Sequence, residues 1–118
     1  MQSESLTIDG MEILANLEQT DRFIDENPFV LLYLSRLDCG VCKSLRPRIS
    51  TMMESFENSR TAYIDLDHLP EATGRFSVFT VPAMLLFVQG KETIREARYV
   101  SVEELAGRIR RYYDLLFS

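Results

Sequence analysis

The segment 29–34, Phe-Val-Leu-Leu-Tyr-Leu, is apolar at every position and shows no alternation of apolar and polar side chains. Such a run predicts a central strand that is covered on both faces, as in parallel α/β sheets. From Cys39 onward the pattern becomes helical, since apolar residues recur every three or four positions, at Val41, Leu45, Ile49, Met52, Met53 and Phe56. Pro47 lies inside this predicted helix and is expected to kink it.

The remaining pattern completes an alternating order of strands and helices. Further strands are predicted at 11–15, 61–66, 81–88 and 92–97, and further helices at 17–26, 69–75 and 102–116. Asn16 with Gln19, and Ser101 with Glu104, have the spacing of capping boxes, and Gly74 is expected near the end of its helix. The last two strands form a hairpin that turns at residues 89–91. We therefore predict an α/β protein with a mixed sheet, in which residues 1–10 are a loosely held segment and residues 11–118 form one domain.

Composition narrows the class of protein. The chain has 118 residues, of which 46% are hydrophobic and 26% charged, which suits one globular domain. The net charge of −5 argues against nucleic acid or anionic lipid as the main partner. The N-terminus lacks the pattern of a signal peptide, and no apolar run is long enough to span a membrane. We therefore expect a cytoplasmic protein, in which two cysteines three positions apart are catalytic, redox-sensing or metal-binding.

The cysteine pair, Cys39-Gly40-Val41-Cys42, lies where the predicted central strand gives way to a helix. Free N–H groups and the helix dipole stabilise an anion at the first turn of a helix, so a thiolate at Cys39 is favoured. Cys42 follows one turn later, close enough to attack a mixed disulfide formed at Cys39. Gly40 keeps the approach to Cys39 open. The motif therefore predicts thiol–disulfide exchange, with Cys39 as nucleophile and Cys42 as resolving thiol.

The tripeptide Thr80-Val81-Pro82 precedes an apolar strand, where proline is expected at a strand start or edge. A cis X–Pro bond costs only about 0.5–1 kcal/mol, so a fold can hold one where it needs a sharp turn. Taken alone, Pro82 is more simply interpreted as a trans turn residue.

Together these features resemble the thioredoxins and thioredoxin-like proteins over residues 11–116. The matching features are the strand 29–34, Cys39-Gly40-Val41-Cys42-Lys43, Pro47, residues 63–67, Val81-Pro82 and Gly90. The resemblance implies a thioredoxin fold with a central mixed sheet of four to five strands, flanked by about four helices. It also implies a thiol–disulfide oxidoreductase that acts on protein disulfides.

The resemblance further assigns roles around the cysteines. Pro82 would be a cis-proline packed against the pair, and the backbone of Val81 would bind an extended substrate segment beside Gly40 and Val41. The Cys39–Cys42 disulfide would be the redox centre, with no other cofactor and no metal. A thioredoxin reductase or a low-molecular-weight thiol would donate electrons, and we expect a monomer or a weak dimer.

Several positions depart from the thioredoxin pattern. Asp38 replaces the tryptophan that usually precedes the first cysteine, and a carboxylate there should oppose the Cys39 thiolate. Gly-Val replaces Gly-Pro between the cysteines, from which we expect a weaker reductant. Tyr33 and Tyr63 align with the buried Asp and Lys that thioredoxins place beneath the motif, so a general base for Cys42 is missing. Arg98 or a neighbour stands where thioredoxins have glycine, so we expect a narrower substrate groove.

Three other functions are compatible with these residues. A metal site is poorly supplied, because the chain has two cysteines and one histidine, His68, although an iron–sulfur cluster shared by a dimer stays open. Glutaredoxin-like chemistry would fit Thr-Val-Pro, but the Gly-Gly and Asp that hold glutathione are missing. The departures also leave room for a non-catalytic or redox-sensing binding module on a thioredoxin scaffold.

Overall fold

The computed structural model describes residues 6–98 and 101–117. Its strands are β1 (Thr7–Ile8), β2 (Met11–Ile13), β3 (Phe29–Ser35), β4 (Arg60–Asp65), β5 (Ala83–Val88) and β6 (Lys91–Ala97). Its helices are α1 (Leu17–Glu26), α2 (Gly40–Met53), α3 (Glu71–Phe76) and α4 (Val102–Phe117). The elements therefore follow the predicted alternation, with one additional strand at the start.

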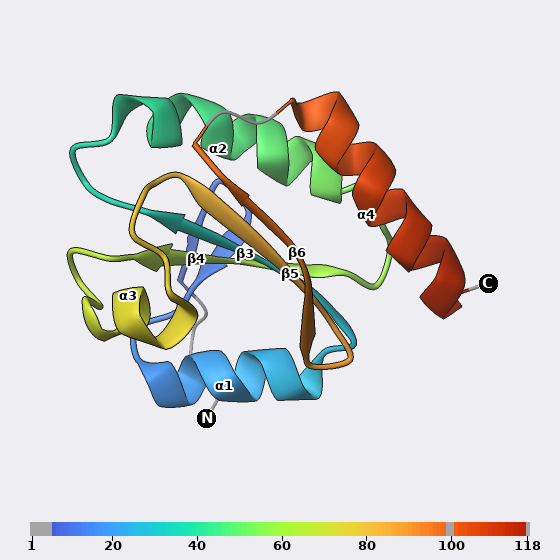
Figure 1. Ribbon diagram of the computed structural model, residues 1–118, viewed down its shortest axis with the longest axis horizontal. Coiled ribbons are helices and arrows are strands. Elements are labelled where there is room, and N and C mark those ends of the chain that lie inside the picture. The colour runs from blue at the N-terminus through green and yellow to red at the C-terminus, as the bar shows by residue number, and fades with distance from the viewer. Residues whose placement is uncertain (1–5, 99–100, 118) are drawn as a thin grey trace.

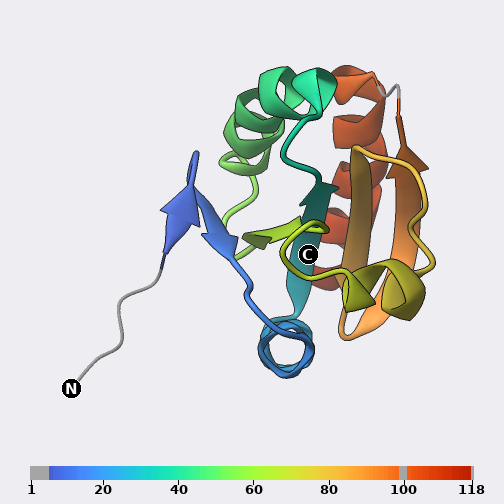
Figure 2. The same ribbon diagram turned by 90° about the vertical axis from the view of Figure 1, so that its left-hand side faces the viewer.

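The six strands form one mixed sheet in the order β1-β2-β4-β3-β5-β6. β2, β4 and β3 are parallel, whereas β5 runs antiparallel to both β3 and β6. Figure 2 shows the β1–β2 hairpin at one edge of the sheet and β6 at the other. The mixed α/β sheet is confirmed, and β3, predicted as the central strand, pairs on both sides.

The count of four to five strands is too low, because β1 was not predicted. Thr7 and Ile8 pair with Glu12 and Met11 across a turn at Asp9-Gly10, where both residues have positive φ, 49° and 82°. Such a turn suits the twist of a two-residue hairpin, and Gly adopts this backbone freely. Residues 7–8 of the segment expected to be loosely held therefore belong to the sheet.

Two helices cover each face of the sheet, so the fold has three layers (Figure 1). On one face, α1 and α3 bury apolar side chains against the sheet, around Val30, Leu32 and Leu34 of β3. On the other face, α2 and α4 pack over Phe29, Leu31 and Tyr33 of the same strand. All seven residues of β3 are buried. This explains why the strand shows no alternation: both of its faces lie in a core.

Helix boundaries follow local chemistry. The predicted caps are present, because the Gln19 N–H donates to Asn16 Oδ1 at 2.7 Å and the Glu104 N–H to Ser101 Oγ at 3.2 Å. α2 continues through Pro47 but ends at Met53 rather than at Phe56, which is buried in the following turn. The kink at Pro47 stays a prediction.

The short helix α3 begins and ends later than predicted. Pro70 is its N-cap, so Leu69 lies outside it, in keeping with the preference of proline for helix starts. Its C-cap is Ser77, which has a left-handed φ of 53°. Gly74 lies near the end of the helix, as predicted, two residues before its last residue.

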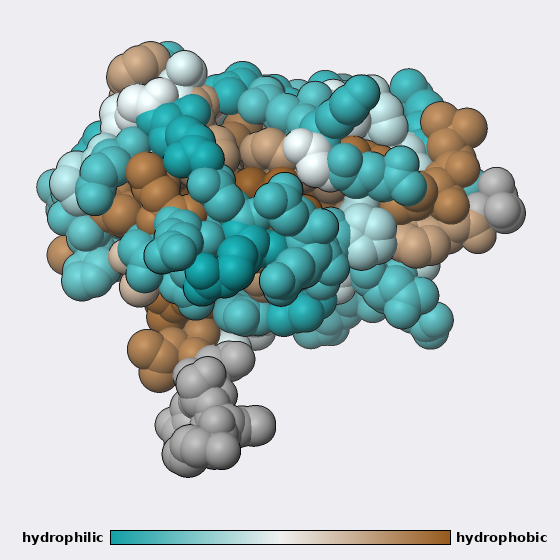
Figure 3. Space-filling model, turned by 90° about the horizontal axis from the view of Figure 1, so that it is seen from below, coloured by the Kyte–Doolittle hydropathy of each residue, from teal (hydrophilic) through white to brown (hydrophobic). Residues whose placement is uncertain are grey.

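The face of the molecule that carries α1 and α3 is mostly hydrophilic, with hydrophobic side chains near the end of α4 and also on the opposite side of this view (Figure 3). Leu115 and Phe117 are the exposed large apolar residues of that helix. Within residues 6–98 and 101–117, no helix is both long and apolar enough to cross a bilayer.

Candidate active site

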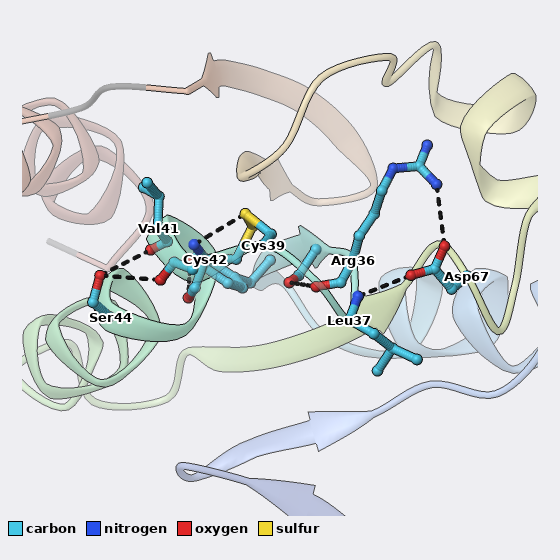
Figure 4. The surroundings of a disulfide bond; sticks show 10 residues. Arg36, Leu37, Cys39, Val41, Cys42, Ser44 and Asp67 are labelled. Atoms are coloured by element: carbon cyan, nitrogen blue, oxygen red, sulfur yellow. Dashed lines mark hydrogen bonds and ion pairs between the residues drawn. A yellow bond between two sulfur atoms is a disulfide. The ribbon is translucent and has the colours of Figure 1, made fainter.

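The sequence places Cys39 and Cys42 at the start of α2, directly after the loop that leaves β3. Cys39 is the N-cap residue, with extended backbone, and the Cys42 N–H donates to Cys39 Sγ at 3.1 Å (Figure 4). The two cysteines form a disulfide, with their Cα atoms 5.2 Å apart. Cys39 is half-buried, whereas Cys42 is fully buried. Only the first sulfur is therefore placed to meet a partner, and it lies at the positive end of a helix dipole.

A groove about 280 Å³ in volume opens beside Cys39. It is lined by Cys39, Gly40, Val41, Val81, Pro82 and Arg98. The structure thus brings together Cys39 and the four residues assigned to substrate binding, although they come from segments about 40 residues apart. The Val81–Pro82 peptide bond is cis. No neighbouring atom lies within 4 Å of the place where a side chain on Gly40 would begin, so the approach to Cys39 is open there.

Besides the buried Cys42, three predicted residues do not line this groove. Asp38 is exposed in the preceding loop, beside Cys39 in the chain. Tyr33 and Tyr63 are buried beneath the motif, directly opposite each other on β3 and β4, with stacked rings 6.3 Å apart. The two tyrosines thus form an uncharged contact in the core of the α2–α4 face.

The Tyr33 hydroxyl donates to the backbone carbonyl of Cys42 at 2.7 Å, rather than to its sulfur. Burial raises the pKa of Tyr33 well above its ordinary value, an effect that the positive charge of Arg46 partly offsets. The phenol therefore stays protonated at neutral pH and cannot accept a proton from Cys42. Its visible role is to tie β3 to the first turn of α2.

A second contact braces the loop that carries Cys39. Asp67, just past the end of β4, accepts a hydrogen bond from the Leu37 N–H at 2.8 Å and pairs with Arg36 at 3.5 Å (Figure 4). Leu37 itself is 64% exposed. The carboxylate thus holds the backbone two residues before the nucleophile, while the ion pair, being exposed, contributes little.

We expect Asp67→Ala to loosen this loop and to lower stability by about 1 kcal/mol, because the Leu37 N–H loses its acceptor. Amide exchange of Leu37 should accelerate, and denaturant unfolding gives the stability change. Asp67→Asn is the matched control, since its amide oxygen still accepts from Leu37 while the charge is gone. Equal losses in both variants would show that the Arg36 ion pair, and not the backbone contact, holds the loop.

Among the residues that the structure describes, no group of three or more His, Cys, Asp or Glu side chains is placed to hold a metal ion. His68 is exposed after β4.

Comparisons with known proteins define the class. The Thioredoxin family model matches residues 12–111, so the chain belongs to the thioredoxin family. Thioredoxin-like protein YdfQ of Bacillus subtilis is 40% identical over 102 residues, covering 86% of this chain and 91% of that protein. Thioredoxin-2 of Pyricularia oryzae is 27% identical over 79 residues, covering 67% of this chain but 46% of that protein.

Solved structures agree on the fold. A single-residue mutant of a thioredoxin from Halobacterium salinarum superposes with a TM-score of 0.80 at 23% identity, covering 93% of this chain and 96% of that one. Fasciola hepatica thioredoxin superposes with a TM-score of 0.77 at 22% identity, covering 85% of this chain and 97% of that one. The thioredoxin fold is thereby confirmed. Family membership and the Cys39–Cys42 pair support thiol–disulfide oxidoreductase activity in general terms.

Asp67 was not predicted to belong to the site, and Arg98 was predicted only as a residue that narrows the groove. Asp67 lies in the segment Asp65-Leu66-Asp67 at the end of a buried strand, a position from which side chains reach the end of the neighbouring strand. Arg98 has no comparable signal, because its place in the groove depends on the turn after β6.

Proposed function

We propose that this chain is a thiol–disulfide oxidoreductase of protein disulfides, in which Cys39 is the nucleophile and Cys42 the resolving thiol. The observation that carries the proposal is the half-buried Cys39 sulfur at the N-cap of α2, facing a groove, with Cys42 buried one turn behind it. The same disulfide is the proposed redox centre, and a thioredoxin reductase or a low-molecular-weight thiol restores the reduced form.

The proposed reaction is a two-electron transfer in two exchange steps. The Cys39 thiolate attacks one sulfur of the substrate disulfide, which forms a mixed disulfide and releases the first substrate thiolate. The Cys42 thiolate then attacks Cys39 Sγ, which forms the Cys39–Cys42 disulfide and releases the second substrate thiolate. The proton of Cys42 passes to solvent or to a departing thiolate. The protein is oxidised and the substrate is reduced.

Ionisation of Cys39 is supported by its place at the helix start. The Cys42 N–H, which contacts Cys39 Sγ in the disulfide form, is a donor that suits a thiolate in the reduced form. Resolution by Cys42 lacks such help, because burial raises the pKa of Tyr33, which therefore cannot act as a base at neutral pH. We therefore propose a specialised member of the family whose second step is slow.

A turnover assay tests the proposal. Reduction of a model protein disulfide by dithiothreitol should accelerate in the presence of catalytic amounts of the protein and fall to the uncatalysed rate with Cys39→Ser. The second candidate, a redox sensor, is favoured by the missing base beneath Cys42. Stoichiometric oxidation without turnover would support the sensor and contradict the catalyst.

A further inference from the structure

Arg98 contributes the charged side chain of the groove beside Cys39. Among the residues that the structure describes, the others that line it are a cysteine, a glycine, two valines and a proline, all uncharged in the oxidised protein. Asp38 is exposed next to Cys39 but does not line the groove. A segment bound in the groove would therefore meet one positive charge.

The backbone of Arg98 is fixed at this place. Its N–H donates to the carbonyl oxygen of Pro82 at 2.7 Å, which links the end of β6 to another residue that lines the groove. Its φ is 68°, in the left-handed region that glycine adopts freely and other residues adopt at a cost. The turn alone does not require arginine at this position, so the strained backbone suggests that the cationic side chain has a function.

No residue that the structure describes engages the guanidinium of Arg98. Among residues 6–98 and 101–117 it forms no ion pair, and Arg98 is exposed. Arg36, Arg95 and Arg108 differ in this respect, since they pair with Asp67, Glu92 and Glu96. Arg98 therefore offers a planar donor that suits a carboxylate brought by a partner.

We propose that Arg98 is a specificity-determining residue that selects disulfides carrying a carboxylate close to the reacting sulfur. The proposal rests on the thiol–disulfide exchange argued above. The groove volume of about 280 Å³ is at the lower end for small-ligand sites, so only a short segment fits and the carboxylate must lie near the disulfide. An acidic residue beside a protein cysteine or a small anionic disulfide presents the same chemistry.

Peptide disulfides of equal length, with Glu, Gln or Lys beside the cysteine, test this selection. The uncatalysed rate with dithiothreitol corrects each substrate for its intrinsic reactivity. Wild-type protein should show kcat/KM roughly threefold to fivefold higher for the Glu peptide than for the Gln peptide, as one exposed ion pair allows, and lowest for Lys. The preference should vanish at about 1 M salt, because the charges are then screened.

Substitutions of Arg98 separate the effect of its positive charge from the effect of its size and shape. Arg98→Gln should abolish the preference, Arg98→Glu should invert it, and Arg98→Lys should retain part of it. Arg22→Gln is the matched control, because it removes one exposed cation from α1, on the opposite face of the sheet from α2 (Figure 1). That variant should keep the wild-type preference.

Small disulfides distinguish the source of the carboxylate. The reduction rates of oxidised glutathione and of neutral hydroxyethyl disulfide are measured with the same variants. If Arg98→Gln changes the rate only for the peptides, the carboxylate belongs to protein substrates, and if it also changes the rate for oxidised glutathione, the carboxylate belongs to low-molecular-weight disulfides. Equal rates for Glu and Lys peptides, or an unchanged preference in Arg98→Gln, would overturn the selection while leaving the exchange activity standing. Absence of turnover with every disulfide would overturn the proposed function, and with it this proposal.

Discussion

The Cys42→Ser variant is expected to accumulate covalent complexes with substrate proteins, whereas Cys39→Ser is expected to accumulate none. Cys39 is half-buried beside the groove and can attack a substrate, but in the variant no second sulfur lies behind it to release the product. Both variants should lose nearly all turnover, because each lacks one of the two exchange steps. Non-reducing electrophoresis after incubation with an oxidised model protein reveals the difference.

Cys39→Ser is itself the matched control for this experiment. It retains Cys42, which is buried, so a disulfide-bonded complex in that variant would show that Cys42 reaches substrates directly. Equal trapping in both variants, or none in either, would refute the assigned order of attack. Dithiothreitol should release every trapped complex, since the link is a mixed disulfide.

The Tyr33→Asp variant is expected to lose about 2–4 kcal/mol of stability at neutral pH. The side chain of Tyr33 is fully buried and faces Tyr63, so a carboxylate there would be desolvated without a cationic partner opposite it. Arg46, the nearby cation that acts on Tyr33, is already paired with Asp9 at 2.8 Å. Denaturant unfolding measures the loss.

The pH dependence of this loss of stability separates the cost of burying a charge from the cost of the cavity left by the tyrosine ring. Burial would raise the pKa of the new carboxyl, so its penalty is absent below the pKa of the unfolded chain and grows as pH rises toward the folded value. Tyr33→Asn is the control, because it removes the same ring without adding a charge. Tyr33→Asp combined with Tyr63→Lys should recover part of the loss. A Tyr33→Asp penalty that matches Tyr33→Asn at every pH would mean that position 33 tolerates charge.

Most of the fold could be predicted from the pattern of apolar and polar side chains, because positions buried in the core are apolar in the sequence. The strand 29–34 has no polar position and proves to lie between two cores. The caps at Asn16 and Ser101 mark helix starts that the structure confirms. β1 was missed because two residues cannot display an alternation; the signal was the Asp9-Gly10 turn, whose backbone suits a tight hairpin.

The site could be predicted from the sequence only where its residues are adjacent in the chain. The spacing of Cys39 and Cys42 indicated a redox pair, and Pro82 was linked to them through the family resemblance. Arg98 reaches the groove through a left-handed turn and a hydrogen bond to Pro82, which no local pattern of residues encodes. Tyr33 was predicted as the residue that replaces a general base, and its hydrogen bond to the backbone carbonyl of Cys42 becomes visible only in the structure.

The hairpin at the amino-terminal edge has a consequence for how the chain behaves in concentrated solution. β1 occupies the outer side of β2, and the Ile13 N–H additionally donates to the Leu6 carbonyl at 2.8 Å. Without these few residues, β2 would present a row of unsatisfied amides beside the buried Met11, which is the kind of open template on which a second molecule can add a strand. The short N-terminal strand thus covers this edge of β2 against the addition of a strand from a second molecule.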